Sequence, residues 1–339
     1  MRSRVQQLTL IVTVAAYLLD PTVSCGRTET TPVSGERAWL VMGTLARAQV
    51  WAPVGADCDA ALAAAHEDLA RLDSLLSTWR EDSAISRVNR AGGGWKTAPR
   101  DLIEALKLGL DVARRSGGAF DPTVLPLVKL WGFRSEPPDS IPSLEAIARC
   151  LTVVDHRLVE VDADEGKIRL AHPDMALDLG GVAKGYALDQ AAEAMLRAGA
   201  LGGILDLGGN LLAFGQGPGR LATIVDPRDG VTILAEVELG HGAVATAGQY
   251  ENRIRIDGRQ YGHILDPRTG WPVSGILSAT VTAPTAGLAD VLATAAFVLG
   301  AHEGRDLVQQ YAGCEGVFVS GDGVGGIQVL VSAGLREIE

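Results

Sequence analysis

The chain has 339 residues, 47% of them hydrophobic and 41 of them glycine, with a net charge of −11. This composition supports a large core with many tight turns, and it excludes a coiled coil or a largely disordered chain. The acidic balance argues against nucleic acid as a partner, because phosphate contacts need a basic face.

The first residues have the pattern of an export signal. A basic start at Arg2 and Arg4 precedes an apolar run over Leu8–Leu19 that is too short to span a bilayer comfortably. The run fits the core of a secretory signal peptide, and the alternative is a buried N-terminal helix. We therefore expect a signal peptide over 1–25 and an exported protein, in the periplasm or on the outer face of the cell membrane.

A lipid anchor at Cys25 is left open by the residues around it. Ser24, directly before the cysteine, fits a lipoprotein signal, whereas Thr22, where Leu is usual, and Asp20-Pro21 do not. Polar residues follow and predict a tether over 26–37, and the folded domain is expected over 38–335.

The first half of this domain is predicted to be mainly helical. A strand is expected over Leu40–Trp51, interrupted by Gly43. Leu and Ala residues at helical spacing predict helices over Asp59–Ser77 and Asp101–Arg115, separated by a polar loop over 78–97. Short strands are expected around 152–171, before a third helix over Val182–Arg197.

The second half is predicted to be mainly strand. Asp257-Gly258 between two short apolar runs is a strong signal for a hairpin with a two-residue turn. A helix is expected over Leu288–Leu299, terminated by Gly300. Hairpins mixed with separated helices predict an α+β fold with mixed, largely antiparallel sheets in one large catalytic unit. The predicted strands are Gly203–Asp206, Leu211–Phe214, Leu221–Val225, Arg253–Ile256, Gln260–Ile264, Ser278–Ala283, Val317–Ser320 and Ile327–Val331.

Cys58, Cys150 and Cys314 are far apart and have no C-x-x-C spacing, so they do not predict a zinc site. In an exported protein two of them could form a disulfide. We favour the alternative, in which each is a small buried apolar residue.

A glycine pair opens the third predicted helix. A strand ends near Asp178, and Gly180-Gly181 leads into the helix. The free amides of a first helical turn favour phosphate, and Lys184 in that turn can add a positive charge. The alternative is a glycine turn with a surface lysine.

Asp290 and Thr294 lie four residues apart and therefore project from the same face of their predicted helix. A carboxylate and a hydroxyl that point together supply the hard oxygen ligands that Mg²⁺ prefers, and phosphates and waters would complete the site. The alternative is that Asp290 lines the surface end of the helix.

Two loop segments are further candidates. His263 precedes the turn-forming run Asp266–Gly270, and a loop histidine can serve as a general base, although a lone histidine is more often structural. The segments Gly118–Thr123 and Leu130–Phe133 combine a turn with aromatic residues, which fits either a packed loop or a ring-binding wall.

Together these segments resemble the ApbE family, the FAD:protein FMN transferases. They occur in the family's order between about residues 40 and 300, and it is this order that makes the match specific. The matching segments are Met42–Thr44, Ser77–Trp79, Ser83–Asn89, Gly118–Thr123, Leu130–Phe133, Asp178–Asp189, Gly208–Asn210, Ala245–Tyr250, His263–Gly270 and Ala289–Thr294.

The resemblance implies a role for each candidate residue, on a fold related to the T-fold. Trp79 stands where many family members have a tyrosine that stacks on the flavin. His263 matches the proposed general base, and Lys184 is expected near the pyrophosphate. The implied Mg²⁺ ligands are the Gly181 carbonyl, Asp290 and Thr294. The implied FAD contacts are Met42, Trp79, Ala119, Phe120, Asp121, Asp178, Lys184 and Leu265.

The implied activity is Mg²⁺-dependent transfer of FMN from FAD to a threonine or serine hydroxyl, with release of AMP. Acceptors of the family carry a motif similar to Asp-x-x-[Ser/Thr]-Gly-Ala-[Ser/Thr], which this chain lacks. The acceptor is therefore expected to be a separate protein, of which a membrane redox subunit is the expected kind. The alternatives are an FAD pyrophosphatase and a flavin-binding lipoprotein without catalysis.

One segment departs from the family pattern. The family usually has Thr-Ser-Gly-Asp before the hairpin, and this chain has Thr246-Ala247-Gly248-Gln249. The change removes a hydroxyl and a carboxylate, so the hydrogen bonding at this place must differ.

Overall fold

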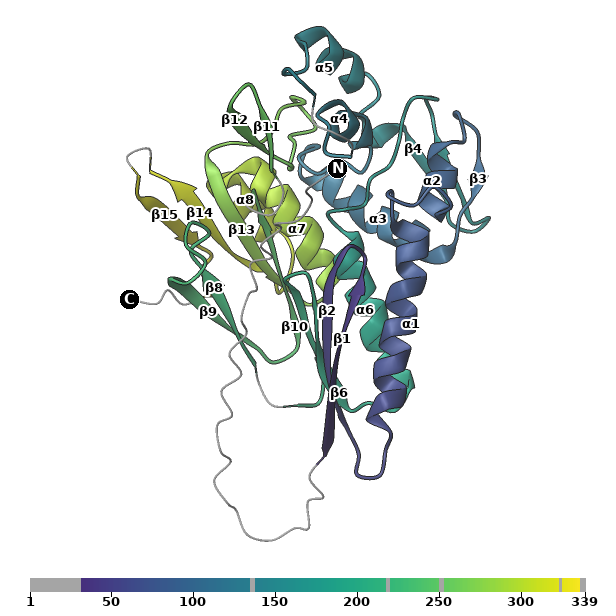
Figure 1. The fold of residues 1–339 in the computed structure, drawn as a ribbon, viewed down its shortest axis with the longest axis vertical. Coiled ribbons are helices and arrows are strands. Elements are labelled where there is room, and N and C mark those ends of the chain that lie inside the picture. The colour runs from purple at the N-terminus through teal and green to yellow at the C-terminus, as the bar shows by residue number, and fades with distance from the viewer. Residues whose placement is uncertain (1–31, 135–137, 218–219, 250–252, 323–324, 336–339) are drawn as a thin grey trace, which may run out of the picture.

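The computed structural model describes residues 32–134, 138–217, 220–249, 253–322 and 325–335. The predicted signal peptide, Cys25 and most of the predicted tether lie outside these residues. An eight-stranded sheet in the order β1-β2-β6-β7-β10-β13-β14-β15 is the centre of the fold (Figure 1). Every neighbouring pair in it is antiparallel. The predicted α+β class with largely antiparallel sheets is confirmed.

The strands of the main sheet are β1 (Val33–Val41), β2 (Thr44–Ala52), β6 (Gly202–Leu207), β7 (Asn210–Gly215), β10 (Gly242–Gly248), β13 (Ile276–Ala283), β14 (Glu315–Gly321) and β15 (Ile327–Val331). The smaller sheets contain β3 (Lys96–Thr97), β4 (Val159–Asp162), β5 (Lys167–Leu170), β8 (Arg220–Val225), β9 (Ile233–Leu239), β11 (Arg253–Ile256) and β12 (Arg259–Gly262). The helices are α1 (Cys58–Leu76), α2 (Ala84–Asn89), α3 (Arg100–Arg115), α4 (Leu125–Leu130), α5 (Leu144–Leu151), α6 (Ala183–Arg197), α7 (Ala286–Leu299) and α8 (Ala301–Val308).

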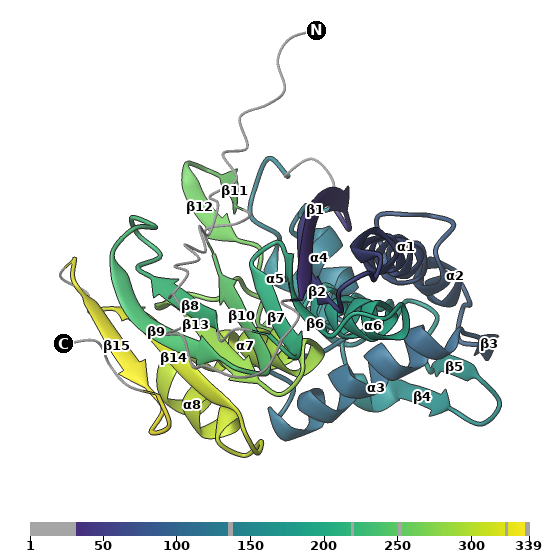
Figure 2. The same cartoon turned by 90° about the horizontal axis from the view of Figure 1, so that it is seen from below.

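Helices and a hairpin cover parts of the main sheet. The largest apolar cluster joins the sheet to α1, α3, α6 and α7. A second cluster joins the β8–β9 hairpin to β7, β10 and β14 (Figure 2). A third cluster surrounds the fully buried Trp131 and joins α4 and α5 to the β11–β12 hairpin. No helix in the described part of the chain is long and apolar enough to cross a membrane.

Helix α7 is the most buried helix of the fold. Its N-cap Thr285 accepts a hydrogen bond from the amide of Leu288, and apolar side chains occupy nearly every position after it. A helix that is apolar all round belongs inside a core rather than on its surface. Asp290 is therefore an exception in this helix, because it is a buried carboxylate among methyl groups.

Helices α6 and α7 approach each other unusually closely at Gly185. A Cβ atom at this glycine would lie 2.1 Å from the carbonyl oxygen of Ala286 and 2.8 Å from the Cβ of Asp290. Asp189, one turn later on α6, accepts hydrogen bonds from the amides of Ala286 and Gly287, each at 2.8 Å. One helix therefore caps the start of the other.

Several boundaries differ from those predicted. The predicted strand over Leu40–Trp51 is a hairpin, because Met42 and Gly43 adopt positive φ angles of 51° and 73° and reverse the chain between β1 and β2. β1 begins at Val33, so residues 33–37 of the predicted tether belong to the sheet. The predicted loop over 78–97 contains α2 and β3. Helices α4, α5 and α8 and strands β9 and β10 were not predicted.

The remaining predicted elements are present. The four predicted helices correspond to α1, α3, α6 and α7. The predicted hairpin at Asp257-Gly258 is confirmed, because both residues have the positive φ angles of a type I′ turn, 50° and 76°. The three described cysteines are free thiols, and Cys314 is buried whereas Cys58 and Cys150 are half-buried.

We predict that Gly185→Ala destabilises the fold by about 1–3 kcal/mol or more, because the added methyl group has no room between α6 and α7. Urea unfolding followed by circular dichroism measures the change. Glu193→Ala on the exposed side of α6 is the control and should change stability by less than about 0.5 kcal/mol. Equal stability of the Gly185→Ala and wild-type proteins would show that the helix contact yields easily.

Candidate active site

The contact between α6 and α7 brings the three predicted metal ligands together. Asp290 Oδ2 accepts a hydrogen bond from the amide of Gly185 at 3.0 Å. Thr294 lies one turn further along α7, and a Cβ atom at Gly181 would be only 2.8 Å from its Oγ1. Gly181, Asp290 and Thr294 therefore meet where the glycine pair enters α6.

The chemistry of these groups fits a small, hard cation. Burial raises the pKa of Asp290, and the charge of Lys184, the amide of Gly185 and the side chain of Asn210 lower it in part. The Thr294 hydroxyl donates its proton to the Asp290 carbonyl at 3.2 Å, so its oxygen lone pairs remain available. The described residues contain no group of three His, Cys, Asp or Glu side chains that could hold a metal. Gly181, Asp290 and Thr294 instead offer a carbonyl, a carboxylate and a hydroxyl oxygen, the kind of donors that suit Mg²⁺ completed by phosphate and water.

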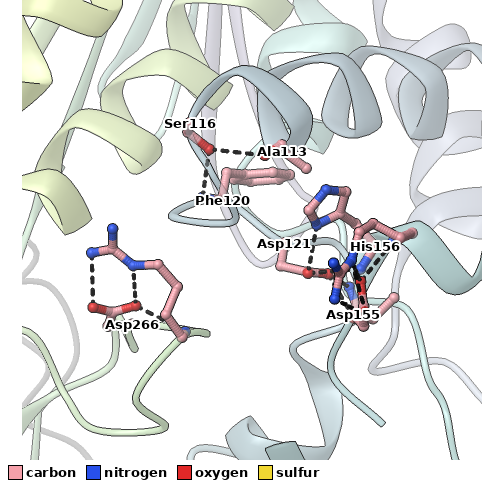
Figure 3. A network of polar contacts seen from close by, with 10 residues as sticks. Ala113, Ser116, Phe120, Asp121, Asp155, His156 and Asp266 are labelled. Carbon is pink, nitrogen blue, oxygen red and sulfur yellow. Dashed lines mark hydrogen bonds and ion pairs between the residues drawn. The ribbon is translucent and has the colours of Figure 1, made fainter. Parts of the chain in front are cut away.

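Phe120 forms a wall of this site. Its ring would lie 3.1 Å from a Cβ atom at Gly181 and 3.1 Å from one at Gly109, so it packs between α3 and the glycine turn. Ser116 at the end of α3 accepts a hydrogen bond from the Phe120 amide at 3.2 Å (Figure 3). The predicted pocket residues Ala119 and Phe120 are both buried here.

Both oxygens of the Asp121 carboxylate accept hydrogen bonds from other residues of the protein. One oxygen accepts hydrogen bonds from the Thr123 amide at 2.8 Å and hydroxyl at 2.6 Å. The other accepts from the His156 amide at 2.8 Å and lies 3.1 Å from His156 Nδ1 (Figure 3). Asp121 thus fixes the shape of the loop beside Phe120, and a direct contact of its side chain with FAD stays a prediction.

Asp178 is held from three sides. Its amide donates to the Pro122 carbonyl at 2.7 Å, and the Asn89 side chain bonds both backbone groups of the preceding Leu177. Arg134 Nη2 donates to Asp178 Oδ2 at 2.5 Å, and the Arg134 guanidinium lies 4.3 Å from the centre of the Trp79 ring. Two predicted FAD contacts, Trp79 and Asp178, are therefore connected through Arg134.

Arg134 is a site residue that the sequence analysis missed. It follows directly after the segment Leu130–Phe133, but a single arginine near a loop has no distinguishing pattern. The signal becomes visible only when the fold brings residues 79, 134 and 178 together.

Two hairpin turns lie side by side near Lys184. Gly208, in the β6–β7 turn, packs so closely on Thr44 of the β1–β2 hairpin that an added Cβ atom would be 2.8 Å from Thr44 Oγ1. Asp206 accepts a hydrogen bond from the Gly209 amide at 3.0 Å. Burial raises the pKa of Asp206, and this hydrogen bond and the charges of Arg47 and Lys184 lower it in part. The turn with Met42 and the start of α6 are thus parts of one region.

His263 and Leu265 come from a separate loop. Within this loop, Leu265 forms a β-bridge with Pro272, and the buried Trp131 indole donates to the Gly270 carbonyl at 2.8 Å. It reaches the Phe120 segment where a Cβ atom at Gly118 would lie 3.8 Å from the Arg268 side chain.

Gln249, which replaces the family's usual aspartate, supports the same loop. Its side chain packs against Gly262, directly before His263, and its amide donates to the Val273 carbonyl. The Val273 amide in turn donates to the Ile264 carbonyl at 3.0 Å. The departure from the family pattern therefore gives a neutral side chain that braces the backbone on both sides of the loop.

Comparison with known proteins identifies the family to which the chain belongs. The model of the ApbE family matches residues 42–318. The chain belongs to the ApbE family. It is 36% identical to a FAD:protein FMN transferase of Treponema pallidum over 84% of each chain. A FAD:protein FMN transferase of Salmonella typhimurium is 33% identical over 87% of each chain.

Solved ApbE structures have the same fold. The ApbE protein of Thermotoga maritima has a TM-score of 0.79 at 31% identity, covering 87% of this chain and 96% of that one. The flavin transferase ApbE of Vibrio cholerae has a TM-score of 0.79 at 26% identity, covering 89% and 98%. The predicted family and fold are therefore confirmed, and the roles of the single ApbE site residues stay predictions.

The cap of α7 by Asp189 predicts a pH dependence. Burial is the main cause that raises the pKa of Asp189 to about 6, above its ordinary value of 3.8. The folded protein thus holds the proton of the Asp189 carboxyl group more tightly than the unfolded chain does. Protonated Asp189 therefore contributes to the free energy of unfolding. This contribution is fully present below about pH 4 and is lost as the pH rises through about 6.

We predict that wild-type stability relative to Asp189→Asn falls by up to about 3 kcal/mol between pH 4 and pH 7. Urea unfolding of both proteins across this range measures the difference. Asp164→Asn in the exposed β4–β5 turn is the control and should follow the wild-type profile. Parallel profiles for wild type and Asp189→Asn would contradict the raised pKa.

Proposed function

We propose that this chain transfers FMN from FAD to a serine or threonine hydroxyl of another protein and releases AMP. The observation that carries the proposal is the meeting of Gly181, Asp290 and Thr294 at the opening of α6, with Lys184 in the first turn of that helix. Relatives that match most of the chain are FAD:protein FMN transferases, which supports the same activity.

The start of α6 is suited to a diphosphate. The positive end of the helix dipole attracts phosphate oxygens, and Lys184 adds a full charge. The glycines before the helix allow a ligand to approach the backbone. The flavin would stack on Trp79, which is 67% exposed, with Met42 and Phe120 closing the pocket.

Gly181, through its carbonyl, and Asp290 and Thr294, through their side chains, would hold Mg²⁺. When bound, the ion would neutralise negative charge that develops as AMP leaves. The protein's own part is to fix the Asp290 and Thr294 oxygens on the buried helix α7, beside the turn with Gly181, so that little rearrangement is needed when the substrate arrives.

His263 would act on the acceptor. Its imidazole takes the proton from the acceptor hydroxyl, and the oxygen attacks the flavin-side phosphorus of FAD. The bond from this phosphorus to the AMP oxygen breaks, so that the flavin is left in a phosphoester with the acceptor and AMP departs. The bracing of the loop by Gln249 and Trp131 supports a fixed position for this base.

The acceptor would be a separate protein with an Asp-x-x-[Ser/Thr]-Gly-Ala-[Ser/Thr]-like motif, such as a membrane redox subunit. Export to the periplasm or the outer face of the membrane, with or without lipid on Cys25, would bring the enzyme to it. The apolar run at Leu8–Leu19 supports this location.

Two rival functions give different products. An FAD pyrophosphatase releases free FMN and AMP without an acceptor, and a flavin-binding lipoprotein releases neither. Incubation with FAD, Mg²⁺ and a motif-bearing acceptor separates the three, since only the transferase makes the acceptor fluorescent in a denaturing gel.

We predict that Asp290→Asn lowers FMN transfer at least about 100-fold, because the ligand charge is lost. The amide oxygen can still accept the Gly185 hydrogen bond, so the fold should persist. Calorimetric Mg²⁺ titration in the presence of FAD should lose its signal in this variant. Asp111→Asn on α3 is the control, and full transfer by Asp290→Asn would refute the metal site.

We predict that His263→Ala binds FAD like the wild type but slows transfer about 100-fold or more. Single-turnover rates with saturating acceptor measure the effect. His302→Ala at the start of α8 is the control and should retain the wild-type rate. An unchanged rate in His263→Ala would dismiss the base.

A further inference from the structure

Arg134 connects three distant parts of the chain at the edge of the candidate site. Its guanidinium lies 4.3 Å from the centre of the Trp79 ring and donates to the Asp178 carboxylate at 2.5 Å. Residues 79, 134 and 178 belong to the segment before α2, the turn after α4 and the turn before α6. The Arg134 side chain thus links the Trp79 indole to the Asp178 carboxylate, which belong to separate segments of the chain.

Arg134 itself is held firmly. Trp131, three residues earlier, is fully buried and anchors the turn through its bond to the Gly270 carbonyl. The amide of Phe133, directly before Arg134, donates to the Val128 carbonyl at 3.1 Å. The Arg134 side chain is only 18% exposed, and Asp178 is 9% exposed. An ion pair this sheltered is weakly screened by solvent and keeps its geometry better than a surface pair.

The pair is not optimised for stability alone. Among the described residues, Arg134 Nε is buried and has no hydrogen-bond partner, which is a cost to the folded state. Trp79 remains 67% exposed although Arg134 covers one face of its indole, so the open area lies on the other face and the edge. An aromatic ring fixed from behind with its other face open is suited to stacking a planar ligand.

We propose that Arg134 is a positioning residue for FAD, which holds the Trp79 indole and the Asp178 carboxylate in the arrangement that the flavin half binds. The inference rests on the proposed function, because it takes Trp79 and Asp178 as FAD contacts. Without the guanidinium, the indole can rotate and Asp178 loses its buried cation, so FAD has to order both groups when it binds. Arg134 therefore acts through preorganisation.

The test is a double-mutant cycle on FAD binding by the purified protein, measured by calorimetry with Mg²⁺. Arg134→Met should raise the Kd for FAD about tenfold, the size expected for a sheltered cation–π contact. In a Trp79→Ala background the same substitution should cost no more than about threefold, because only the Asp178 carboxylate is then left to be positioned. Arg134→Lys should be intermediate, since it keeps the charge beside Asp178 but not the planar stack. In transfer assays KM should rise more than kcat falls.

A matched control lies elsewhere on the surface. Arg115 stands 5.0 Å from the centre of the Tyr311 ring and bonds Asp111 at 3.2 Å, the same combination of aromatic ring and carboxylate. Arg115→Met should leave the Kd for FAD unchanged. Melting curves establish whether each variant is folded. If Arg134→Met does not fold, Arg134→Lys takes its place in the cycle.

The outcomes are distinct. A wild-type protein that binds no FAD would overturn the proposed function before any variants are compared. Wild-type FAD affinity in both Arg134 variants, or an equal loss with and without Trp79, would overturn the positioning role while leaving the proposed function standing. A loss that depends on Trp79 supports it.

Discussion

The close contact of α6 and α7 is the constraint on which the rest of the site depends. Gly185 allows the backbone of α6 to lie against the first turn of α7, and no larger residue fits. From this contact follow the cap of α7 by Asp189 and the bond from the Gly185 amide to Asp290. A carboxylate buried among methyl groups is costly, and here it is held beside the positive start of a neighbouring helix.

Three further parts of the chain surround this contact. Phe120 packs against Gly181, and Asp121 fixes the loop behind it through Thr123 and His156. The turns at Met42 and Gly208 close the side near Lys184. The loop with His263 reaches the Phe120 segment at Gly118 and is braced by its own contacts. The part that would hold the diphosphate and the part that would act on the acceptor therefore have separate supports.

Much of the fold was predictable because periodic apolar patterns carry most of the information. The amphipathic helices α1 and α3 and the Asp257-Gly258 turn were found for this reason. β10 was missed because its sequence, Gly242–Gly248, is made mainly of glycine and alanine and lacks the branched side chains that usually mark a strand. The Met42-Gly43 reversal was missed because methionine rarely adopts a positive φ.

For the site, the spacing of Asp290 and Thr294 and the glycine pair at 180–181 were readable as separate hints. Their meeting was not, since it depends on the fit of Gly185 against Ala286 across about a hundred residues of chain. For Asp121 the sequence suggested a contact with FAD, which stays a prediction. Its hydrogen bonds to Thr123 and to the distant His156 became visible only in the fold.

Helix α7 is surrounded by other elements of the fold, which limits where the chain can accept substitutions. A helix packed on all sides tolerates few substitutions, so the part of α7 that carries Asp290 and Thr294 has little room for change. The β11–β12 hairpin packs mainly on a smaller, separate apolar cluster and can vary with less effect on that helix. Substitutions in that hairpin, rather than in α7, are therefore the ones that the fold accepts at least cost.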